Sequence, residues 1–208
     1  RKAFQASSKQ SVTYGLNDGD LTASNISYKS DSSRYTATIE KDSYDVTCKI
    51  PGEFNVYNSL AAIAVGRRVG LSKEQIEQGI AALESVDGRM MRVQAGQVFT
   101  VIVDFAHTPD SFERLLSDVR KHTTGKMVVM FGSAAKRDVS KRAIQGEIAG
   151  KYADEVVLTE EDDRDEDGLS ILNDIAEGVT KTGKEVEKDL FLVHDRVQAI
   201  EFSLKRVL

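Results

Sequence analysis

A chain of 208 residues, of which 40% are hydrophobic, is long enough for one large domain or two smaller ones. Its net charge of -5, with lysines and arginines spread along the sequence, argues against a nucleic-acid-binding surface. The single cysteine, Cys48, excludes an internal disulfide, and no apolar run approaches the roughly 20 residues of a membrane span. We therefore expect a cytoplasmic protein that binds neither nucleic acid nor membrane.

The first part of the chain is predicted to be an antiparallel β-meander. Strand-like segments at residues 11–15, 21–28, 34–40 and 44–50 are separated by turn-forming Asn, Asp, Gly, Lys and Ser residues. Pro51 and Gly52 end this series. Two helices are predicted next, at residues 55–69 and 72–84, and Ser72 with Gln75 forms a capping-box pattern at the start of the second.

After Gly88 the pattern changes to alternating strands and helices. Strands are predicted at residues 98–105, 126–132, 155–159 and 190–193, and helices at residues 110–121, 141–152, 169–181 and 196–207. This alternation is typical of right-handed crossovers and a mainly parallel sheet covered on both faces. The predicted fold class is therefore α/β, with domains at residues 1–87 and 88–208 that meet at a hinge in residues 87–90.

Polar side chains follow the predicted strand of residues 98–105. Asp104 and His107 are expected at the carboxyl edge of the parallel sheet, where open α/β sheets bind their ligands. The same residues would also suit an ordinary strand-to-helix turn with polar caps. No metal site is predicted, because the sequence has no cluster of Cys and His residues with ligand spacing.

Two other segments suit a nucleotide. Asn55 and Asn58 lie three residues apart on a predicted first helical turn, and an amide can both donate to and accept from an adenine edge. Asn55 would equally serve as the N-cap of that helix. Arg89 follows Gly88 at the hinge, and its guanidinium matches phosphate geometry, although a surface ion pair is the ordinary role of such an arginine.

Two loops carry charges that suit an amino-acid ligand. Residues 131–142 combine small residues with several cations, including Arg137, at a helix N-terminus, which favours an anion. A solvated basic turn is the alternative. The acidic run of residues 160–167 contains Asp163 and one arginine, Arg164. That arginine is either a structural counter-ion or, with the carboxylates around it, part of a site for a zwitterionic ligand.

Taken in order, these segments resemble the Mur ligase family, and the resemblance covers nearly the whole chain. The matching residues are 52–62 (GEFNVYNSLAA), 88–90 (GRM), 103–111 (VDFAHTPDS), 131–132 (FG), 136–138 (KRD), 141–142 (KR) and 195–196 (DR). The match is best with members that add the third residue of the peptidoglycan stem peptide. Several motifs in the right order and spacing are far more specific than any one alone.

The resemblance implies an ATP-dependent ligase. It would activate a carboxylate of a UDP-linked muramoyl dipeptide as an acyl-phosphate, which the amine of the incoming amino acid attacks. The implied ATP-binding residues are Asn55, which contacts adenine, Asn58, Asp104 at the ribose, Arg89 at the phosphates, and His107, which lines the same site. Arg89 and His107 are the expected catalytic residues.

Arg137, Arg164 and Asp163 are the residues that the resemblance assigns to the amino-acid substrate. Two convergent arginines favour meso-diaminopimelate, which carries a second carboxylate. The carboxylates of Glu161, Asp162 and Asp163 would instead suit the ammonium group of lysine or ornithine. The sequence has Glu161-Asp-Asp-Arg164 where the family has Asp-Asn-Pro-Arg, and only the arginine is kept.

The resemblance also implies that the sequence is a fragment. It corresponds to the second half of a central ATPase domain followed by a truncated, Rossmann-like C-terminal domain that binds the amino acid. The family's phosphate-binding loop, carbamylated lysine and Mg²⁺ ligands lie outside this sequence. The fragment alone is expected to be inactive, and the intact enzyme is expected to be a monomer that uses ATP with Mg²⁺.

Three other interpretations remain open. A folylpolyglutamate synthetase-like ligase shares the same catalytic logic, but His107-Thr-Pro-Asp110 favours the Mur interpretation. A non-catalytic Mur-like module that binds nucleotide would suit the altered acidic motif, although the presence of Asn55, Arg89, Asp104 and His107 together argues against it. A generic nucleotide-binding α/β domain would leave the conjunction of motifs unexplained.

Overall fold

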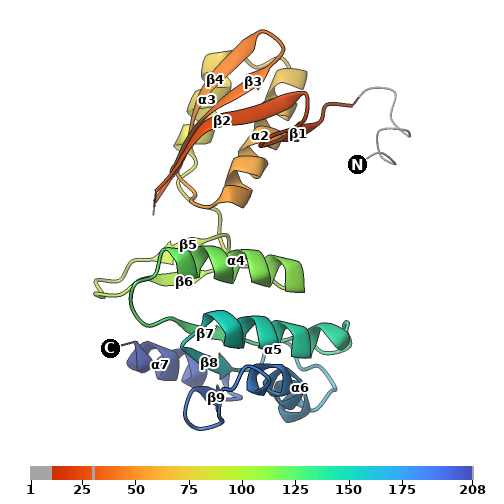
Figure 1. The fold of residues 1–208 in the computed structure, drawn as a ribbon, viewed down its shortest axis with the longest axis vertical. Helices are drawn as coiled ribbons and strands as arrows, with labels where there is room; N and C mark the ends of the chain where they lie inside the picture. Colours follow the sequence, from red (N-terminus) through yellow and green to blue (C-terminus); the bar gives the residue numbers. More distant parts are fainter. Residues whose placement is uncertain (1–10, 30, 208) are drawn as a thin grey trace. The chain divides into compact units, whose positions relative to one another are not determined.

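The computed structural model describes residues 11–29 and 31–207, which belong to two compact units. The first unit extends to Ala95 and also includes Val101–Asp104. The second comprises Gly96–Thr100 and the chain from Phe105 onward. Each unit combines a β-sheet with helices, so the α/β fold class predicted from the sequence is confirmed (Figure 1).

The first unit contains a four-stranded sheet in the order β1-β2-β3-β4, packed against two helices. Alternate residues of β3 and β4, such as Tyr35 and Val46, are buried against Leu60 and Ile63 of α2. The Tyr35 hydroxyl also hydrogen bonds to Ser59 at 2.8 Å, which ties the sheet to that helix. The elements are β1 (Tyr14–Gly15), β2 (Leu21–Tyr28), β3 (Ser33–Ile39), β4 (Asp42–Cys48), α2 (Glu53–Arg68) and α3 (Lys73–Ala82).

The predicted meander is antiparallel only from β2 to β4. The short strand β1 pairs with β2 in parallel, with Tyr14 opposite Leu21. The loop between them is closed by Asp20, whose carboxylate accepts hydrogen bonds from the Thr13 backbone N–H at 2.7 Å and hydroxyl at 2.8 Å. The chain therefore forms a turn closed by hydrogen bonds between Thr13 and Asp20, and not the antiparallel hairpin that the turn-forming residues predicted.

A separate two-stranded antiparallel sheet joins β5 (Met91–Val93) to β6 (Val101–Val103). We expected residues 98–105 to form one strand of the parallel sheet, and this expectation is wrong. Only Val101–Val103 is extended, and its hydrogen-bonded partner is the neighbouring strand β5. The apolar run predicted a strand but could not specify its partner, and β5, with Arg92 at its centre, has no apolar run of its own.

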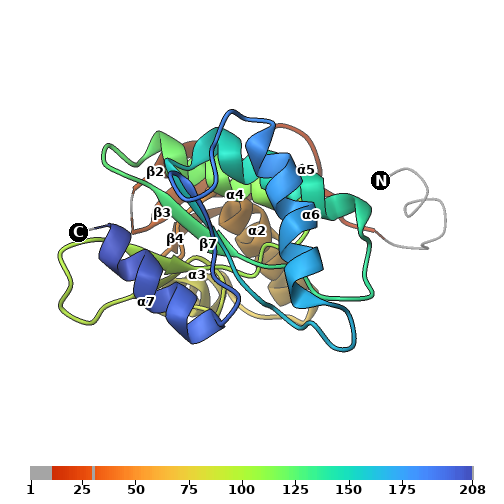
Figure 2. The same ribbon diagram turned by 90° about the horizontal axis from the view of Figure 1, so that it is seen from below.

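The second unit contains the predicted parallel sheet, in the order β7-β8-β9. Val156 and Leu158 of β8 face a core that includes α4, α5 and α6, whereas Val157 faces Phe202 of α7 on the opposite side. Helices therefore cover both faces of the sheet, as expected (Figure 2). The elements are α4 (Pro109–Lys121), β7 (Val128–Phe131), α5 (Ser140–Tyr152), β8 (Glu155–Leu158), α6 (Gly168–Thr180), β9 (Leu190–Leu192) and α7 (Arg196–Arg206).

Helices α5 and α6 pack unusually closely because glycines lie at their contact. A Cβ atom added at Gly178 would lie 1.8 Å from the carbonyl oxygen of Ala143, and one at Gly146 would lie 2.1 Å from that of Ile175. Neither position has room for a side chain. This close contact sets the spacing of the two helices whose N-termini open toward the loops after β7 and β8.

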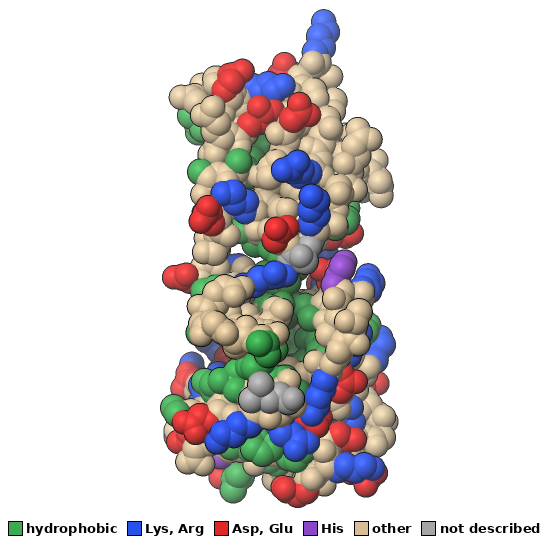
Figure 3. All heavy atoms as spheres, turned by 90° about the vertical axis from the view of Figure 1, so that its left-hand side faces the viewer, with side chains coloured by type: hydrophobic (Ala, Val, Ile, Leu, Met, Phe, Trp, Pro, Cys, Tyr) green, Lys and Arg blue, Asp and Glu red, His purple; other side chains and the backbone are tan. Residues whose placement is uncertain are grey.

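Positive and negative side chains alternate over the face drawn in Figure 3, where neither sign forms a continuous patch. Within residues 11–29 and 31–207, the structure contains no helix with both the length and the apolar character that a membrane crossing requires.

Candidate functional site

The loops that follow β7 and β8 leave the same edge of the parallel sheet and contact each other. The backbone N–H of Ala135 in the first loop donates to the carbonyl oxygen of Asp162 in the second at 2.9 Å. A Cβ atom at Gly132 would lie 2.2 Å from the carbonyl oxygen of Thr159, so only glycine permits this approach. Arg137 and Arg164, which we assigned to the amino-acid substrate, therefore lie on neighbouring loops.

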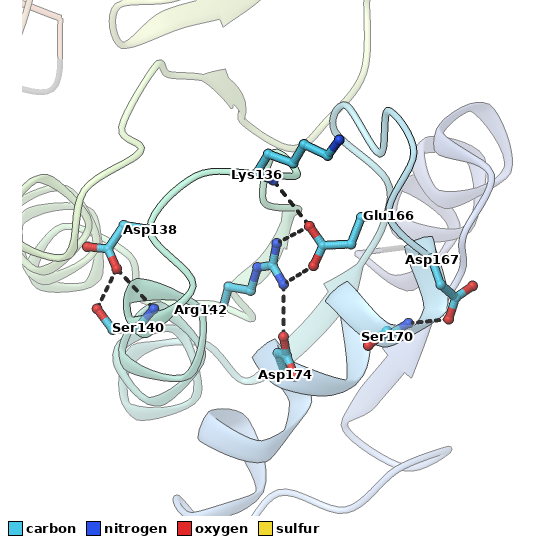
Figure 4. A network of polar contacts seen from close by, with 8 residues as sticks. All are labelled: Lys136, Asp138, Ser140, Arg142, Glu166, Asp167, Ser170 and Asp174. Atoms are coloured by element: carbon cyan, nitrogen blue, oxygen red, sulfur yellow. Dashed lines mark hydrogen bonds and ion pairs between the residues drawn. The ribbon is translucent and has the colours of Figure 1, made fainter.

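A buried arginine connects the same two loops. Arg142, in the first turn of α5, is only 1% exposed. Its guanidinium donates to both carboxylate oxygens of Glu166, at 2.7 and 3.0 Å, and to Asp174 of α6 at 2.9 Å (Figure 4). One oxygen of Glu166 also accepts the backbone N–H of Lys136 at 3.1 Å. A bidentate, charge-assisted pair of this kind is among the strongest polar contacts in proteins.

This network shifts the protonation equilibria of its members. The Arg142 guanidinium and, secondly, the Lys136 N–H hold the pKa of Glu166 at about 2, well below its ordinary value of 4.5. The hydrogen bond to Glu166 raises the pKa of Arg142 in turn. The pair is therefore charged throughout the physiological range. Within the described residues, the Arg142 Nε is buried without a hydrogen-bond partner, so the guanidinium is held entirely through its two terminal nitrogens.

Most cations of residues 131–142 are already engaged. Lys136 pairs with Asp165, Lys141 donates to the His107 carbonyl oxygen at 3.2 Å, and Arg142 is buried in its network. Arg137 is exposed and has no hydrogen bond or ion pair to the described residues. The anion-binding character expected of this segment therefore rests on Arg137 and the opening of α5.

Arg164 and Asp163 both have partners at this edge. The Nε of Arg164 donates to the Asp162 carboxylate at 3.0 Å, in a pair whose side chains are 41% and 52% exposed. Asp163 lies 2.6 Å from the Nε2 of His194, which follows β9. A Cβ atom at Gly168 would lie within 2.2 Å of both members of this second pair, so they pack directly on the start of α6.

Glu160, Asp163 and His194 form a group whose potential ligand atoms lie within 4.8 Å of one another. Ligands at the usual distances around a tetrahedral zinc ion would be separated by about 3.3 Å. The 2.6 Å between Asp163 and His194 is shorter than that separation, so an ion would have to part them. The observed geometry is that of a hydrogen-bonded carboxylate and imidazole.

In the first unit, Asn55 and Asn58 lie together at the start of α2. Asn55 is buried, its amide donates to the Pro51 carbonyl oxygen at 2.7 Å, and its side-chain oxygen accepts from the Asn58 amide at 3.0 Å. The alternative role of Asn55 as N-cap is wrong, because the N-cap is Gly52, whose φ of 102° turns the chain into the helix. Asn58 is exposed and presents the outer amide of the pair.

Arg89 and Asp104 are brought together through Met90. The Asp104 carboxylate accepts the backbone N–H of Met90 at 2.8 Å, and Arg89 is the exposed residue that precedes it. Asp104 follows β6 and belongs to the first unit, whereas the chain from Phe105 onward belongs to the second. In the second unit, His107 is exposed and its ring packs edge-on against Phe105 at 5.0 Å between centroids.

Four residues of the second unit's polar network were not singled out as site residues from the sequence. They are Arg142, Glu166, Asp174 and His194. Arg142 belongs to the family motif at residues 141–142, but its partner Glu166 lies 24 residues away, and only the fold brings the two together. The sequence signal that could have found Glu166 is its place near the end of the acidic run, next to the start of α6.

Residues 88–208 match the family described as Mur ligase, glutamate ligase domain, and residues 1–66 match the Mur ligase middle domain. A UDP-N-acetylmuramyl-tripeptide synthetase of Roseiflexus sp. (strain RS-1) is 39% identical over 194 residues, which cover 93% of this chain and 38% of that protein. A UDP-N-acetylmuramoyl-L-alanyl-D-glutamate--2,6-diaminopimelate ligase of Bacillus licheniformis is 43% identical over 176 residues, covering 84% and 36%. The chain thus spans about two fifths of the length of these curated relatives.

Solved structures show the same likeness. A structure named as a 2,6-diaminopimelate ligase of the same kind aligns with a TM-score of 0.58 and 27% identity, over 95% of this chain and 40% of that one. The folylpolyglutamate synthase of Mycobacterium tuberculosis aligns with a TM-score of 0.73 but only 19% identity, over 91% of this chain and 41% of that one. The latter likeness shows a shared fold alone.

Proposed function

Because this chain belongs to the Mur ligase family, we propose that it is part of an ATP-dependent ligase of peptidoglycan synthesis in the cytoplasm. The proposed reaction adds a third amino acid, meso-diaminopimelate, to UDP-N-acetylmuramoyl-L-alanyl-D-glutamate through an acyl-phosphate. The activity is assigned to the longer protein, since the chain spans about two fifths of its relatives. The 208-residue chain alone is expected to be inactive.

The observation that carries the proposal is the pair of neighbouring loops at the edge of the parallel sheet. Arg137 is exposed without a described partner, and Arg164 lies on the loop hydrogen bonded to its own. Two guanidiniums on adjoining loops suit a substrate with carboxylates at both ends. The Asp162 partner of Arg164 partly neutralises that charge, so the site combines a free cation with a paired one.

The first unit would hold part of the ATP. Asn55 has one amide hydrogen uncommitted after its bond to Pro51, and Asn58 is exposed beside it, which fits an adenine edge. Arg89 would reach the phosphates and Asp104 the ribose, and His107 would line the nucleotide site. ATP supplies the phosphoryl group that activates the carboxylate, while these residues bind and orient it. Mg²⁺ is assigned to ligands outside this chain.

We also propose that residues 1–87 are the end of the ATPase domain, that residues 88–208 are the amino-acid-binding domain, and that the enzyme is a monomer. A folylpolyglutamate synthetase-like ligase is the alternative activity, and a non-catalytic nucleotide-binding module is the alternative class. Each alternative predicts a different result in assays of the full-length protein.

The decisive experiment measures ADP release by the full-length protein with UDP-N-acetylmuramoyl-L-alanyl-D-glutamate and each of three amino acids: meso-diaminopimelate, lysine and ornithine. Amino-acid-dependent ADP release with diaminopimelate, and a kcat/KM at least tenfold above the other two, supports the proposal. A preference for lysine or ornithine contradicts the substrate assignment. Two further measurements test the alternatives: ADP release with a folate and glutamate, and ATP binding by calorimetry. ADP release only with the folate and glutamate identifies the folylpolyglutamate synthetase-like ligase, and ATP binding without turnover of any substrate identifies the non-catalytic module.

A further inference from the structure

We propose that Arg142 is a positioning residue of the amino-acid site. Acting through Glu166, it would hold the loop of residues 160–167 against the loop after β7 and so fix the spacing of Arg137 and Arg164. This inference rests on the proposed function for the identity of the ligand. It adds a residue that does not itself touch the substrate.

The contacts of Glu166 make it the link between the loops. Its carboxylate accepts hydrogen bonds from both terminal nitrogens of Arg142, at 2.7 and 3.0 Å, and from the backbone N–H of Lys136 at 3.1 Å. Lys136 directly precedes Arg137, and Arg164 lies two residues before Glu166. A displacement of this carboxylate would therefore be transmitted through one or two peptide units to each substrate-facing arginine.

The backbone at Arg164, and at Lys136 next to Arg137, needs such support. Lys136 has a φ of 52° and Arg164 a φ of 49°, which are left-handed conformations that residues with a side chain seldom adopt. Conformations of this kind persist where the surroundings determine them. The hydrogen bond from Lys136 to Glu166 and that from Ala135 to Asp162 supply those surroundings.

Asp174 provides a matched control within the same network. Its carboxylate accepts a hydrogen bond from Arg142 at 2.9 Å but projects from α6, and among the described residues it has no hydrogen bond or ion pair with either loop (Figure 4). Asp174→Asn therefore removes one charged partner of Arg142 and leaves the contacts of Glu166 in place. Glu166→Gln keeps the shape of the linking side chain but removes its charge, and Arg142→Lys keeps the charge but removes the fork.

The experiment uses the full-length protein with these three variants and two readouts. The first is hydrogen exchange at the Ala135 and Lys136 amides, which donate across the loops. The second is steady-state kinetics, with KM measured separately for the amino acid that the wild type uses, for ATP and for the muramoyl dipeptide. Arg142→Lys and Glu166→Gln should speed exchange of both amides at least tenfold.

The same two variants should raise the KM of the amino acid at least tenfold, with kcat and the KM of ATP within twofold. Asp174→Asn should change the amide exchange rates, kcat and each KM by less than threefold from the wild-type values. If Arg142 has a purely structural role, its substitution should change the KM values of all three substrates alike, or Asp174→Asn should have the same effect. Either result overturns the proposal, and so does unchanged exchange of the two amides. If Arg142→Lys does not fold, the results for Glu166→Gln alone test the proposal. A wild type without amino-acid-dependent turnover refutes the proposed function, whereas the amide exchange still tests the link.

Discussion

The Asp104 carboxylate accepts the backbone N–H of Met90 at 2.8 Å and thereby joins the end of β6 to the residue before β5. Met90 has a φ of 48°, so the carboxylate stabilises a backbone conformation that a methionine seldom adopts. Arg89 immediately precedes it. The bond therefore fixes the main chain beside the arginine that we assign to the phosphates.

Asp104→Ala should lower the free energy of unfolding by about 1 kcal/mol, because a hydrogen bond to a half-buried charged group is lost. In the full-length protein the same change should raise the KM of ATP more than tenfold, since the proposed ribose contact is lost as well. Asp104→Asn keeps an acceptor oxygen and should be less destabilising. Chemical denaturation and ATP kinetics measure the two effects. A destabilised variant with unchanged ATP kinetics would leave Asp104 a structural residue only.

Arg137→Ala and Arg164→Ala should both reduce kcat/KM for diaminopimelate at least tenfold, equivalent to about 1.4 kcal/mol. Neither should change the free energy of unfolding by more than about 0.5 kcal/mol, because Arg137 has no described partner and the Arg164–Asp162 pair is solvent-exposed. Full turnover of diaminopimelate by Arg164→Ala would contradict its role in substrate binding. Arg114→Ala, which removes an exposed i,i+4 pair with Asp110 on α4, is the matched control.

The Glu166 carboxylate should contribute a pH-dependent part of the stability. Its pKa is depressed to about 2 in the folded chain, from 4.5, so its stabilising contribution is complete above about pH 4.5 and is lost as the pH falls toward 2. The free energy of unfolding of the wild type should therefore exceed that of Glu166→Gln most at pH 5 to 7. The difference should shrink between pH 4.5 and 2. A constant difference across urea titrations at these pH values would show that the ionised carboxylate is not responsible.

Gly178→Ala should destabilise the second unit by about 3 kcal/mol or more, because the new Cβ would lie 1.8 Å from the Ala143 carbonyl oxygen and force α5 and α6 apart. Gly79→Ala is the matched control in α3, where no atom lies within 4 Å of the added Cβ. That substitution should stabilise its helix by about 0.5 to 1 kcal/mol through helix propensity alone. Thermal unfolding of both variants tests the contrast, and equal effects would contradict the close contact.

Much of the fold could be predicted because it depends on local patterns. The predicted capping box of Ser72 with Gln75 begins α3, the helix predicted from residue 110 is α4, and short apolar runs mark β7, β8 and β9. Strand partners depend on distant backbone and were harder to predict. The parallel pairing of β1 with β2 and the antiparallel pairing of β6 with β5 were both missed for this reason.

In the candidate site too, some features could be predicted from local patterns and others could not. Arg137 and Arg164 could be placed on neighbouring loops because strand order in a parallel sheet brings successive loops to one edge. The Arg142–Glu166 pair and the Asp163–His194 pair could not be predicted, since they join residues 24 and 31 positions apart. Whether a charged side chain faces solvent or a buried partner depends on packing that no local pattern specifies.

Glu166 holds the loop of residues 160–167 in place. It follows the part of that loop that carries Arg164 and that contacts the neighbouring loop through the Asp162 carbonyl oxygen. Side chains at positions 161 and 162 can therefore be exchanged while the Glu166 carboxylate, which holds the loop in place, and the Asp163–His194 pair at the start of α6 are kept. A loop of this construction separates the evolution of ligand preference from the maintenance of backbone shape. A library that varies these two positions and keeps Arg142, Asp163 and Glu166 would search for new amino-acid preferences on a constant scaffold.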